Sequence, residues 1–279
     1  MKPTSYIFCA LAVILIIAGI ITCVVAGNMA KSEGIELFEG TVDENGNTVF
    51  VKDLTGRTIA NFTLTIDDAN VNIYGGADKS RVELVNFNPN GYSYSINNRT
   101  FTLSDSLNIL SFFSFGGDAA GFKGLRYYFT GRNVNGREKS VNIYIADGSA
   151  INIIDISSEK GNITVDNLKE SISYTLYAEK GNVEISSVIS NKDGSIVCKS
   201  GKVLLKDTYI KKLRADITEG DFEEILLSTG RNSYDLTTKN GTIYVGGADK
   251  GKEYDENSPI EAAKVYVTVK KGDIIIDAR

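Results

Sequence analysis

The sequence contains no histidine and no tryptophan, and only three cysteines and three prolines among its 279 residues. Without histidine, a Ser-His or Cys-His nucleophile pair and a His-ligated metal are excluded. The net charge of −5 is the opposite of the basic excess that nucleic-acid-binding domains carry, so we expect no nucleic-acid partner. We predict that the protein is not an enzyme, and we assign no catalytic, cofactor-binding or metal-ligating residues.

The cysteines cannot form a disulfide framework. Cys9 and Cys23 lie in an apolar N-terminal stretch, and Cys198 stands alone in the rest of the chain. An extracytoplasmic domain of a bacterium that does not rely on disulfides fits this pattern, and so does a cytoplasmic domain. The side of the membrane therefore has to be argued from other residues.

One long apolar run is present. Residues 6–26 carry no charge, and a helix of this length spans one bilayer core of about 30 Å. We predict an uncleaved transmembrane helix. A cleaved signal peptide is the alternative, although the run is longer than a signal h-region. Lys2 on one side, and Lys31 followed by two glutamates on the other, favour a cytoplasmic N-terminus at residues 1–5 and an extracytoplasmic body.

The rest of the chain is predicted to be all-β. Residues 27–57 are polar and turn-rich, and we expect a spacer and a first strand at 47–52. From residue 58 onward apolar and polar residues alternate with period two, for example over residues 61–66. The string GGADK occurs twice, at residues 75–79 and 246–250, and we predict that both copies form turns.

The strongest pattern between residues 58 and 279 is an internal repeat: two polar residues, glycine, a polar residue, then an apolar-x-apolar strand. Glycine suits a tight corner, and the strand points two side chains inward. One unit cannot bury its inner face alone, whereas stacked units form a continuous core. The repeat glycines are Gly161, Gly181, Gly201, Gly220, Gly241 and, after a longer interval, Gly272.

This spacing predicts a single-stranded parallel β-solenoid of about 20 residues per coil, and parallel stacking of like strands favours right-handed winding. About eleven coils starting near Asn61 would give a rod of roughly 50 Å. An open antiparallel sandwich is the rival fold, but it does not explain the fixed period. Cys198 takes an apolar slot of the register and is expected to pack in the core.

Two features are candidate interaction surfaces. An aromatic-rich insertion at about residues 100–136 is predicted to be a capping or inserted hairpin or, alternatively, a ligand or partner surface. A basic run from Lys199 to Arg214 is predicted to be a solvated face or, alternatively, a strip for anionic wall polymers or lipid headgroups. The candidate residues are Phe112, Phe113, Phe115, Tyr127, Tyr128, Lys199, Lys202, Lys206, Lys211 and Lys212.

The last repeat strand is followed by only three residues, without a polar capping segment. We therefore expect the C-terminal coil to present a free edge, at which two chains associate by edge pairing.

The repeat resembles that of a bacterial family of β-strand-repeat domains of unknown function, known as putative adhesins. The resemblance rests on IDDANVNIY at residues 66–74, VNIYI at 141–145 and SEKGNI at 158–163, and it covers about residue 58 to the C-terminus. The middle strand of the family commonly ends in proline, whereas Ala146 follows here. The resemblance implies a surface-exposed solenoid with adhesive or envelope-stress roles, and it brings no catalytic residues.

These features predict a non-enzymatic, membrane-anchored cell-surface protein that acts as an adhesin-like binding or scaffold module. Its expected partners are the membrane and a cell-wall polymer or another membrane protein. An envelope-stress regulatory accessory protein that contacts a membrane partner is the first alternative. A polysaccharide-active β-helix enzyme is the second, and it is disfavoured because outward aspartates occur on any solenoid.

Overall fold

The computed structural model describes residues 39–87, 92–105, 137–226, 232–258 and 262–278. Every regular element within these ranges is a β-strand, which agrees with the all-β prediction. None of the described residues belongs to a helix with the length and hydropathy needed to cross a bilayer. The helix predicted at residues 6–26 lies outside the described residues.

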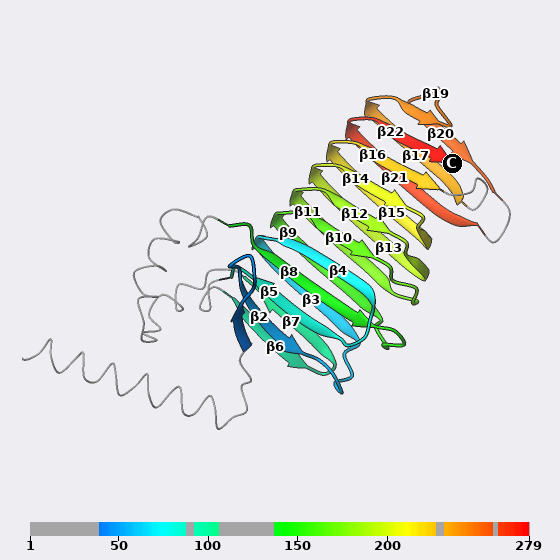
Figure 1. The fold of residues 1–279 in the computed structure, drawn as a ribbon. Coiled ribbons are helices and arrows are strands. Elements are labelled where there is room, and N and C mark those ends of the chain that lie inside the picture. The colour runs from blue at the N-terminus through cyan, green and yellow to red at the C-terminus, as the bar shows by residue number, and fades with distance from the viewer. Residues whose placement is uncertain (1–38, 88–91, 106–136, 227–231, 259–261, 279) are drawn as a thin grey trace, which may run out of the picture.

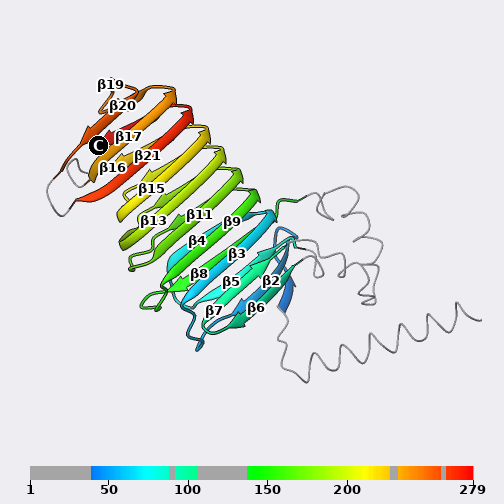
Figure 2. The ribbon, with the colours of Figure 1, turned by 180° about the vertical axis from the view of Figure 1, so that it is seen from behind.

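The strands form two sheets that face each other across one core (Figure 1). Sheet A contains, in spatial order, β1 (Glu39–Val42), β2 (Thr48–Asp53), β5 (Arg81–Val85), β8 (Ser140–Ala146), β4 (Asn70–Ala77), β10 (Ile163–Asp166), β12 (Val183–Ser186), β14 (Val203–Lys206), β16 (Phe222–Leu226), β22 (Ile274–Ala278), β18 (Ile243–Val245) and β19 (Ala248–Gly251). Sheet B, in front in Figure 2, contains β20 (Glu253–Glu256), β17 (Asn232–Asn240), β21 (Ala263–Lys271), β15 (Tyr209–Glu219), β13 (Ile189–Ser200), β11 (Ser173–Lys180), β9 (Ile153–Lys160), β3 (Asn61–Asp68), β7 (Thr100–Ser104) and β6 (Ser93–Asn97).

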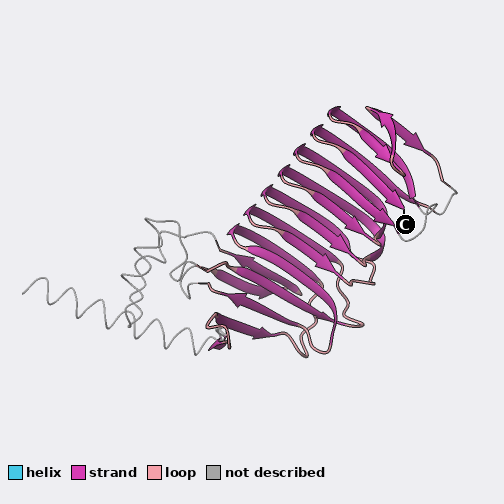
Figure 3. Ribbon diagram, turned by 45° about the horizontal axis from the view of Figure 1, so that its top comes forward, coloured by secondary structure: helices cyan, strands magenta, loops and turns pink. Residues whose placement is uncertain are grey.

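Each coil of the solenoid consists of one strand of sheet B, a corner and one strand of sheet A, and from β9/β10 to the C-terminus the corner is a glycine. Successive coils pair in parallel and in register, so that Ile163 lies beside Val183, and Val183 beside Val203. The spacing of these partners is the 20-residue period of the sequence. The predicted parallel β-solenoid is therefore confirmed for the described residues, and Figure 3 shows its stacked coils.

Glycine is required at the corners because consecutive corners touch. Gly181 and Gly201 have φ angles of 148° and 149°, a region that side chains rarely adopt. A Cβ on Gly201 would overlap the carbonyl oxygen of Gly181, and a Cβ on Gly181 would overlap that of Gly161. The corner glycines therefore set the close approach of one coil to the next.

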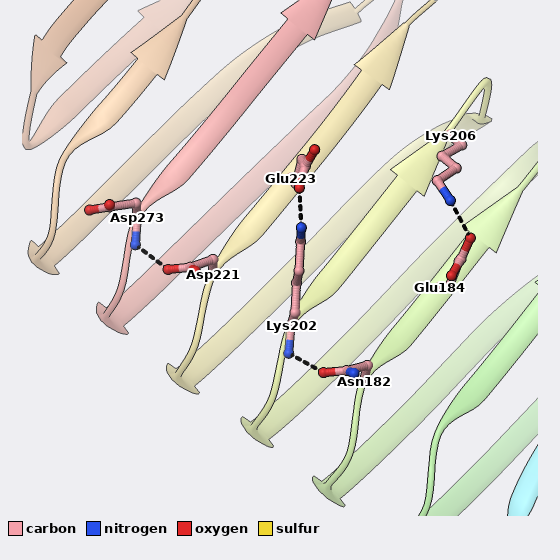
Figure 4. Close-up of polar contacts among 7 residues, drawn as sticks. All are labelled: Asn182, Glu184, Lys202, Lys206, Asp221, Glu223 and Asp273. Atoms are coloured by element: carbon pink, nitrogen blue, oxygen red, sulfur yellow. Dashed lines mark hydrogen bonds and ion pairs between the residues drawn. The ribbon is translucent and has the colours of Figure 1, made fainter.

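The residue after each corner glycine forms a second ladder. Asn162 Oδ1 accepts a hydrogen bond from the backbone N of Asn182 at 2.9 Å. Asn182 Oδ1 accepts one from Lys202 N at 2.8 Å (Figure 4). Asp221 Oδ1 accepts one from Asp273 N at 2.8 Å in the same way. Lys202 has no side-chain acceptor, so the ladder is interrupted between Lys202 and Asp221.

The core is a single layer of inward side chains between the two sheets. Strand β11 shows the pattern, with Tyr174, Leu176 and Ala178 buried and the residues between them pointing outward. Cys198 is fully buried in this layer, and burial raises the pKa of its thiol to about 11. The prediction that Cys198 is a core residue is confirmed.

Coils at both ends of the solenoid stack out of sequence order. Along the axis the order is β7/β8, β3/β4, β9/β10, β11/β12, β13/β14, β15/β16, β21/β22 and β17/β18. In Figure 1 the red strands of β21/β22 lie between the yellow β15/β16 coil and the orange β17/β18 coil. These eight coils span roughly 34 Å at the usual strand spacing of about 4.8 Å.

The expectation of about eleven coils was wrong because much of the chain between the coils builds the two ends. Antiparallel strands β5, β2 and β1 extend sheet A beyond β8, and β6 pairs with β7 in sheet B. At the other end β19 pairs with β18, and β20 pairs with β17. The two glycines of the second GGADK string form the turn between β18 and β19, as predicted, and its last three residues belong to β19. The glycines of the first string lie within β4 at a register shift, so the turn predicted there was wrong.

The expectation of a free edge at the C-terminal coil was also wrong. Strand β22 pairs with β16 on one side and with β18 on the other, and β21 likewise lies between β15 and β17. The outermost described strands at this end are β19 and β20, which are four residues long and rich in exposed charged residues. Short, charged edges disfavour pairing with another chain.

Candidate functional site

The outer face of sheet A carries a tetrapeptide that occurs twice. Val-Asn-Ile-Tyr stands at residues 71–74 on β4 and at residues 141–144 on β8. In both strands the Val and Ile side chains are buried in the core, and the Asn and Tyr side chains point outward. The two strands pair in parallel and in register, so identical outward residues lie side by side.

These outward pairs contact each other directly. Asn72 Nδ2 donates a hydrogen bond of 2.9 Å to Asn142 Oδ1. The rings of Tyr74 and Tyr144 have centroids 5.4 Å apart and an interplanar angle of 30°. The guanidinium carbon of Arg81, on β5, lies 3.8 Å from the centroid of the Tyr144 ring. We call Arg81, Tyr144 and Tyr74 the tyrosine–arginine stack.

A carboxylate fixes the guanidinium at the outer end of the stack. Arg81 Nε donates a hydrogen bond of 2.7 Å to Glu83 Oε1, two residues along the same strand. This bond raises the pKa of Arg81 above its ordinary value. Cation–π contact and the ion pair together hold the Arg81 side chain over the ring.

Both tyrosines of the stack remain neutral phenols at physiological pH. Partial burial raises the pKa of Tyr74, and the nearby carboxylate of Asp166 raises it further. Burial also raises the pKa of Tyr144, with Glu83 adding to the rise. The site therefore offers aromatic faces and phenol hydroxyls beside a neutralised Arg–Glu pair.

Short side chains continue the column beyond Tyr74. Asp166 on β10 lies beside Tyr74 in the register, Ser186 on β12 beside Asp166, and Lys206 on β14 beside Ser186. Lys206 Nζ in turn pairs with Glu184 Oε1 at 2.6 Å (Figure 4). Three strand spacings, roughly 14 Å, separate the strand of Tyr74 from that of Lys206. We call the two short polar side chains between them, those of Asp166 and Ser186, the shelf.

The ten residues predicted from the sequence do not form one surface. Phe112, Phe113, Phe115, Tyr127 and Tyr128 lie outside the described residues. Lys202 and Lys206 belong to the sheet A side of the solenoid, whereas Lys199, Lys211 and Lys212 are exposed on strands β13 and β15 of sheet B. The outer faces of the two sheets point in opposite directions, so the five lysines do not line one strip.

The lysines on sheet A are paired between neighbouring coils. Lys202 Nζ contacts Glu223 Oε2 on β16, and Lys206 contacts Glu184 on β12 (Figure 4). On sheet B the ammonium of Lys212 lies 5.8 Å from the centroid of the Tyr266 ring. Partly exposed ion pairs of this kind contribute little to stability.

A buried ion pair joins the two described segments that flank residues 106–136, which include most of the predicted aromatic insertion. Asp105 ends the described chain before the undescribed residues 106–136, and Lys139 follows shortly after them. Lys139 Nζ pairs with Asp105 Oδ2 at 3.2 Å, and both side chains are buried. Phe101 belongs to strand β7 and is a fully buried core residue, so the core continues into the first residues of the predicted insertion.

Sequence reasoning did not select Tyr74 and Tyr144, although their signal is present. The two Val-Asn-Ile-Tyr strings entered the sequence analysis only as part of the family resemblance. In a parallel solenoid, however, strands with the same sequence tend to pair in register, so that identical residues lie side by side. An outward tyrosine that occurs in two such strands therefore predicts an aromatic pair. No group of three or more Cys, Asp or Glu side chains in the described part of the chain is arranged to hold a metal ion.

The geometry defines a class: a two-sheet parallel β-solenoid with a polar and aromatic outer face. Residues 59–274 match the model of the Toastrack DUF4097 family, a domain of unknown function, and the chain belongs to this family. No curated protein matches the chain.

The chain is similar to several solved structures. A putative cell adhesion protein from Clostridium sporogenes is 14% identical, with a TM-score of 0.47 over 86% of this chain and 100% of that one. A putative adhesin from Bacteroides fragilis is 13% identical, with a TM-score of 0.34 over 83% and 97%. One from Parabacteroides distasonis is 12% identical, with a TM-score of 0.24 over 81% and 96%.

Proposed function

We propose that the protein is a non-enzymatic, membrane-anchored binding module of the cell surface that takes up a hydroxyl-rich polysaccharide on the outer face of sheet A. The tyrosine–arginine stack with its shelf is the observation that carries this proposal. The apolar C–H face of a sugar ring packs on an aromatic face, and its hydroxyls need polar partners of both kinds.

The described residues supply these partners around one aromatic face. The Tyr74 ring is at the end of the stack that adjoins the shelf. On the shelf, Asp166 accepts hydrogen bonds, and Ser186 donates and accepts them. The phenol of Tyr74 does both, and burial keeps it protonated. A ring that stacks on Tyr74 would thus continue the column and place its hydroxyls over the shelf.

Binding of purified cell-wall polysaccharide to the full-length protein in detergent tests the proposal. Tyr74→Ala is expected to weaken binding roughly tenfold to a hundredfold, because stacked aromatic contacts and their buried area contribute about 1.5–3 kcal/mol. Tyr177→Ala is the matched control. Tyr177 is a partly buried, outward tyrosine on β11 of sheet B, beside Glu179.

Two outcomes separate binding from a structural role of the stack, and a further variant tests the hydroxyl of Tyr74. Weakened binding in Tyr74→Ala with normal binding in Tyr177→Ala supports the proposal. Equal binding in both variants, with lower thermal stability in Tyr74→Ala, means that the stack only joins coils. Tyr74→Phe keeps the ring but removes the hydroxyl, so it is expected to retain most of the affinity.

The membrane topology is part of the proposal: residues 6–26 span the membrane, residues 1–5 are cytoplasmic and the solenoid faces outward. Protease treatment of intact cells that carry a C-terminal tag on the protein tests it. We expect loss of the tag while a cytoplasmic control protein survives. Protection of the tag, in an envelope shown to admit the protease, contradicts the outward orientation.

A further inference from the structure

An acidic residue occupies a core position of the solenoid. Glu224 is the third residue of strand β16 and is 1% exposed. Its neighbours at the same level of sheet A are Leu205 on β14 and Ile276 on β22. Both neighbours are buried and apolar, so Glu224 stands in a column that the other coils fill with aliphatic side chains.

The partner of Glu224 comes from a coil that is not adjacent. Asn232 Nδ2, at the start of β17, donates a hydrogen bond of 2.7 Å to Glu224 Oε1, and Asn232 is 3% exposed. The β21/β22 coil lies between the coils of these two residues. In that coil Ala263 is the register partner of Asn232, and its short side chain leaves room for the amide to reach across.

Three buried oxygens of this cluster lack a well-formed hydrogen bond among the described residues: Glu224 Oε2, Asn232 Oδ1 and Tyr234 Oη, although the phenol of Tyr234 lies close enough to act on both the carboxyl and the amide. The first two belong to the two side chains that are already joined. With the carboxyl ionised, these two atoms are both acceptors and cannot pair with each other, and the single phenol proton of Tyr234 can satisfy only one of them. A proton on Oε2 lets the carboxyl donate to Oδ1 of the same amide, which satisfies both atoms in one acid–amide pair.

We propose that Glu224 is protonated in the folded protein and that the Glu224–Asn232 pair is a proton-dependent clasp across the β21/β22 coil. Loss of the proton breaks one of the two bonds and leaves an ionised carboxylate in the core. The β17/β18 coil then packs less tightly, and the β21/β22 coil, which lies between it and the β15/β16 coil, is held less firmly in place. This device goes beyond the proposed binding function, which it does not require.

The electrostatic surroundings agree with the clasp. Burial raises the pKa of Glu224 from its ordinary value of 4.5 to about 7, and the adjacent Tyr234 and Asn232 side chains offset only part of the rise. The inward residues of the flanking strands β14, β15, β21 and β22 are apolar. Tyr234 faces the carboxyl from β17, and Glu256 on β20 acts on Tyr234; burial and these carboxylates keep the phenol protonated.

The direction of the pH effect follows from the raised pKa. Below pH 4.5 the carboxyl is protonated in the folded and unfolded states alike, so it has no effect on the folding equilibrium. Between pH 4.5 and about 7 the carboxyl releases its proton in the unfolded state but keeps it in the folded state. The folded state, in which the clasp is closed, therefore loses stability as the pH rises. Above about pH 7 the loss is complete, and one pKa unit of difference is one tenfold factor in the opening equilibrium.

Hydrogen exchange of the full-length protein in detergent, corrected for intrinsic exchange rates, tests the clasp at pH 5 and pH 9. We expect protection of the β17 and β22 amides to fall by a factor on the order of 50–100 between these pH values. Glu224→Gln should retain its protection at pH 9. Glu223→Gln is the matched control, because it removes the outward carboxylate next along β16 and should behave like the wild type.

Further readouts keep the test decisive. An infrared carbonyl band of a protonated carboxylic acid is expected at pH 6 in the wild type and absent in Glu224→Gln. If Glu224→Gln does not fold, Glu224→Leu replaces it, because Leu205 fills the same slot in the next coil. The proposal is overturned if wild-type protection is the same at both pH values, or if both Glu224 variants lose protection as the wild type does.

Discussion

The corner glycines allow a quantitative test of how the coils stack. We consider Gly201→Ala, in the middle of the solenoid. A φ angle of 149° is open almost only to glycine, and an alanine held there costs about 1–3 kcal/mol. The added Cβ also overlaps the carbonyl oxygen of Gly181, so the two corners must move apart.

Moving the corners apart weakens three hydrogen bonds. Gly181 N donates to Ser200 O at 3.0 Å, Val183 N to Lys202 O at 2.9 Å, and Lys202 N to Asn182 Oδ1 at 2.8 Å. Each such bond contributes about 1 kcal/mol. With partial loss of these bonds, Gly201→Ala should lower the free energy of unfolding by about 3–5 kcal/mol, a large part of the 5–15 kcal/mol typical of a domain.

Urea unfolding of the full-length protein, followed by circular dichroism, measures this loss. Gly148→Ala is the control, because Gly148 also has a positive φ, 75°, but nothing lies within 4 Å of the added Cβ. That variant should lose only about 1–2 kcal/mol. A loss in Gly201→Ala no larger than in Gly148→Ala would refute the close contact between corners.

Three further predictions follow from contacts of the described residues. Lys202→Asn supplies the missing acceptor of the corner ladder and should stabilise the protein by about 1 kcal/mol in urea unfolding, since the lost pair with Glu223 contributes less; a destabilised variant contradicts this. Asp105→Ala removes the partner of buried Lys139 and should cost about 3–5 kcal/mol in thermal unfolding, whereas a cost below 1 kcal/mol would mean that the pair is dispensable. Deletion of residues 262–279 removes the coil between β16 and β18 and should give aggregates in size-exclusion chromatography; a monomer with native circular dichroism contradicts this.

The repeating part of the fold could be predicted from the sequence because each coil carries its own signal. The corner glycine and the apolar-x-apolar strand recur together, and both have a local physical cause. The inward position of Cys198 followed from the same register and is correct. The predictions at residues 6–26 and for the aromatic candidates fall outside the described residues and stay predictions.

The order of the coils could not be predicted in this way. Parallel stacking of like strands does not specify which repeat lies beside which, and neighbours in sequence are only the simplest choice. The structure places the corner of Gly272 between those of Gly220 and Gly241. The hairpin strands after β18 occupy the end of the stack, and the later coil fills the position left beside β16.

The candidate site was missed for a related reason. Tyr74 and Tyr144 are 70 positions apart in the sequence, and only the stacking of β4 on β8 brings them together. Glu224 was also missed, although in the sequence a carboxyl stands where the repeat requires an apolar residue. Its meaning depends on Asn232, which reaches it across another coil. Long-range pairing of this kind is absent from local patterns.

The coils that stack out of sequence order at the two ends limit where such a protein can gain or lose a coil. At each end the outermost coil is covered by antiparallel strands, and the coil beneath it pairs with one that is not its neighbour in sequence: β4 pairs with β10, and β22 with β16. A 20-residue unit added at either end would separate partners that now hold each other. Between β9 and β16, by contrast, consecutive coils also follow one another in sequence, and an extra unit only displaces the two ends by roughly 4.8 Å. Duplication or removal of whole coils, whether by evolution or by design, is therefore expected to be tolerated in this middle segment, with the end structures carried along as fixed modules.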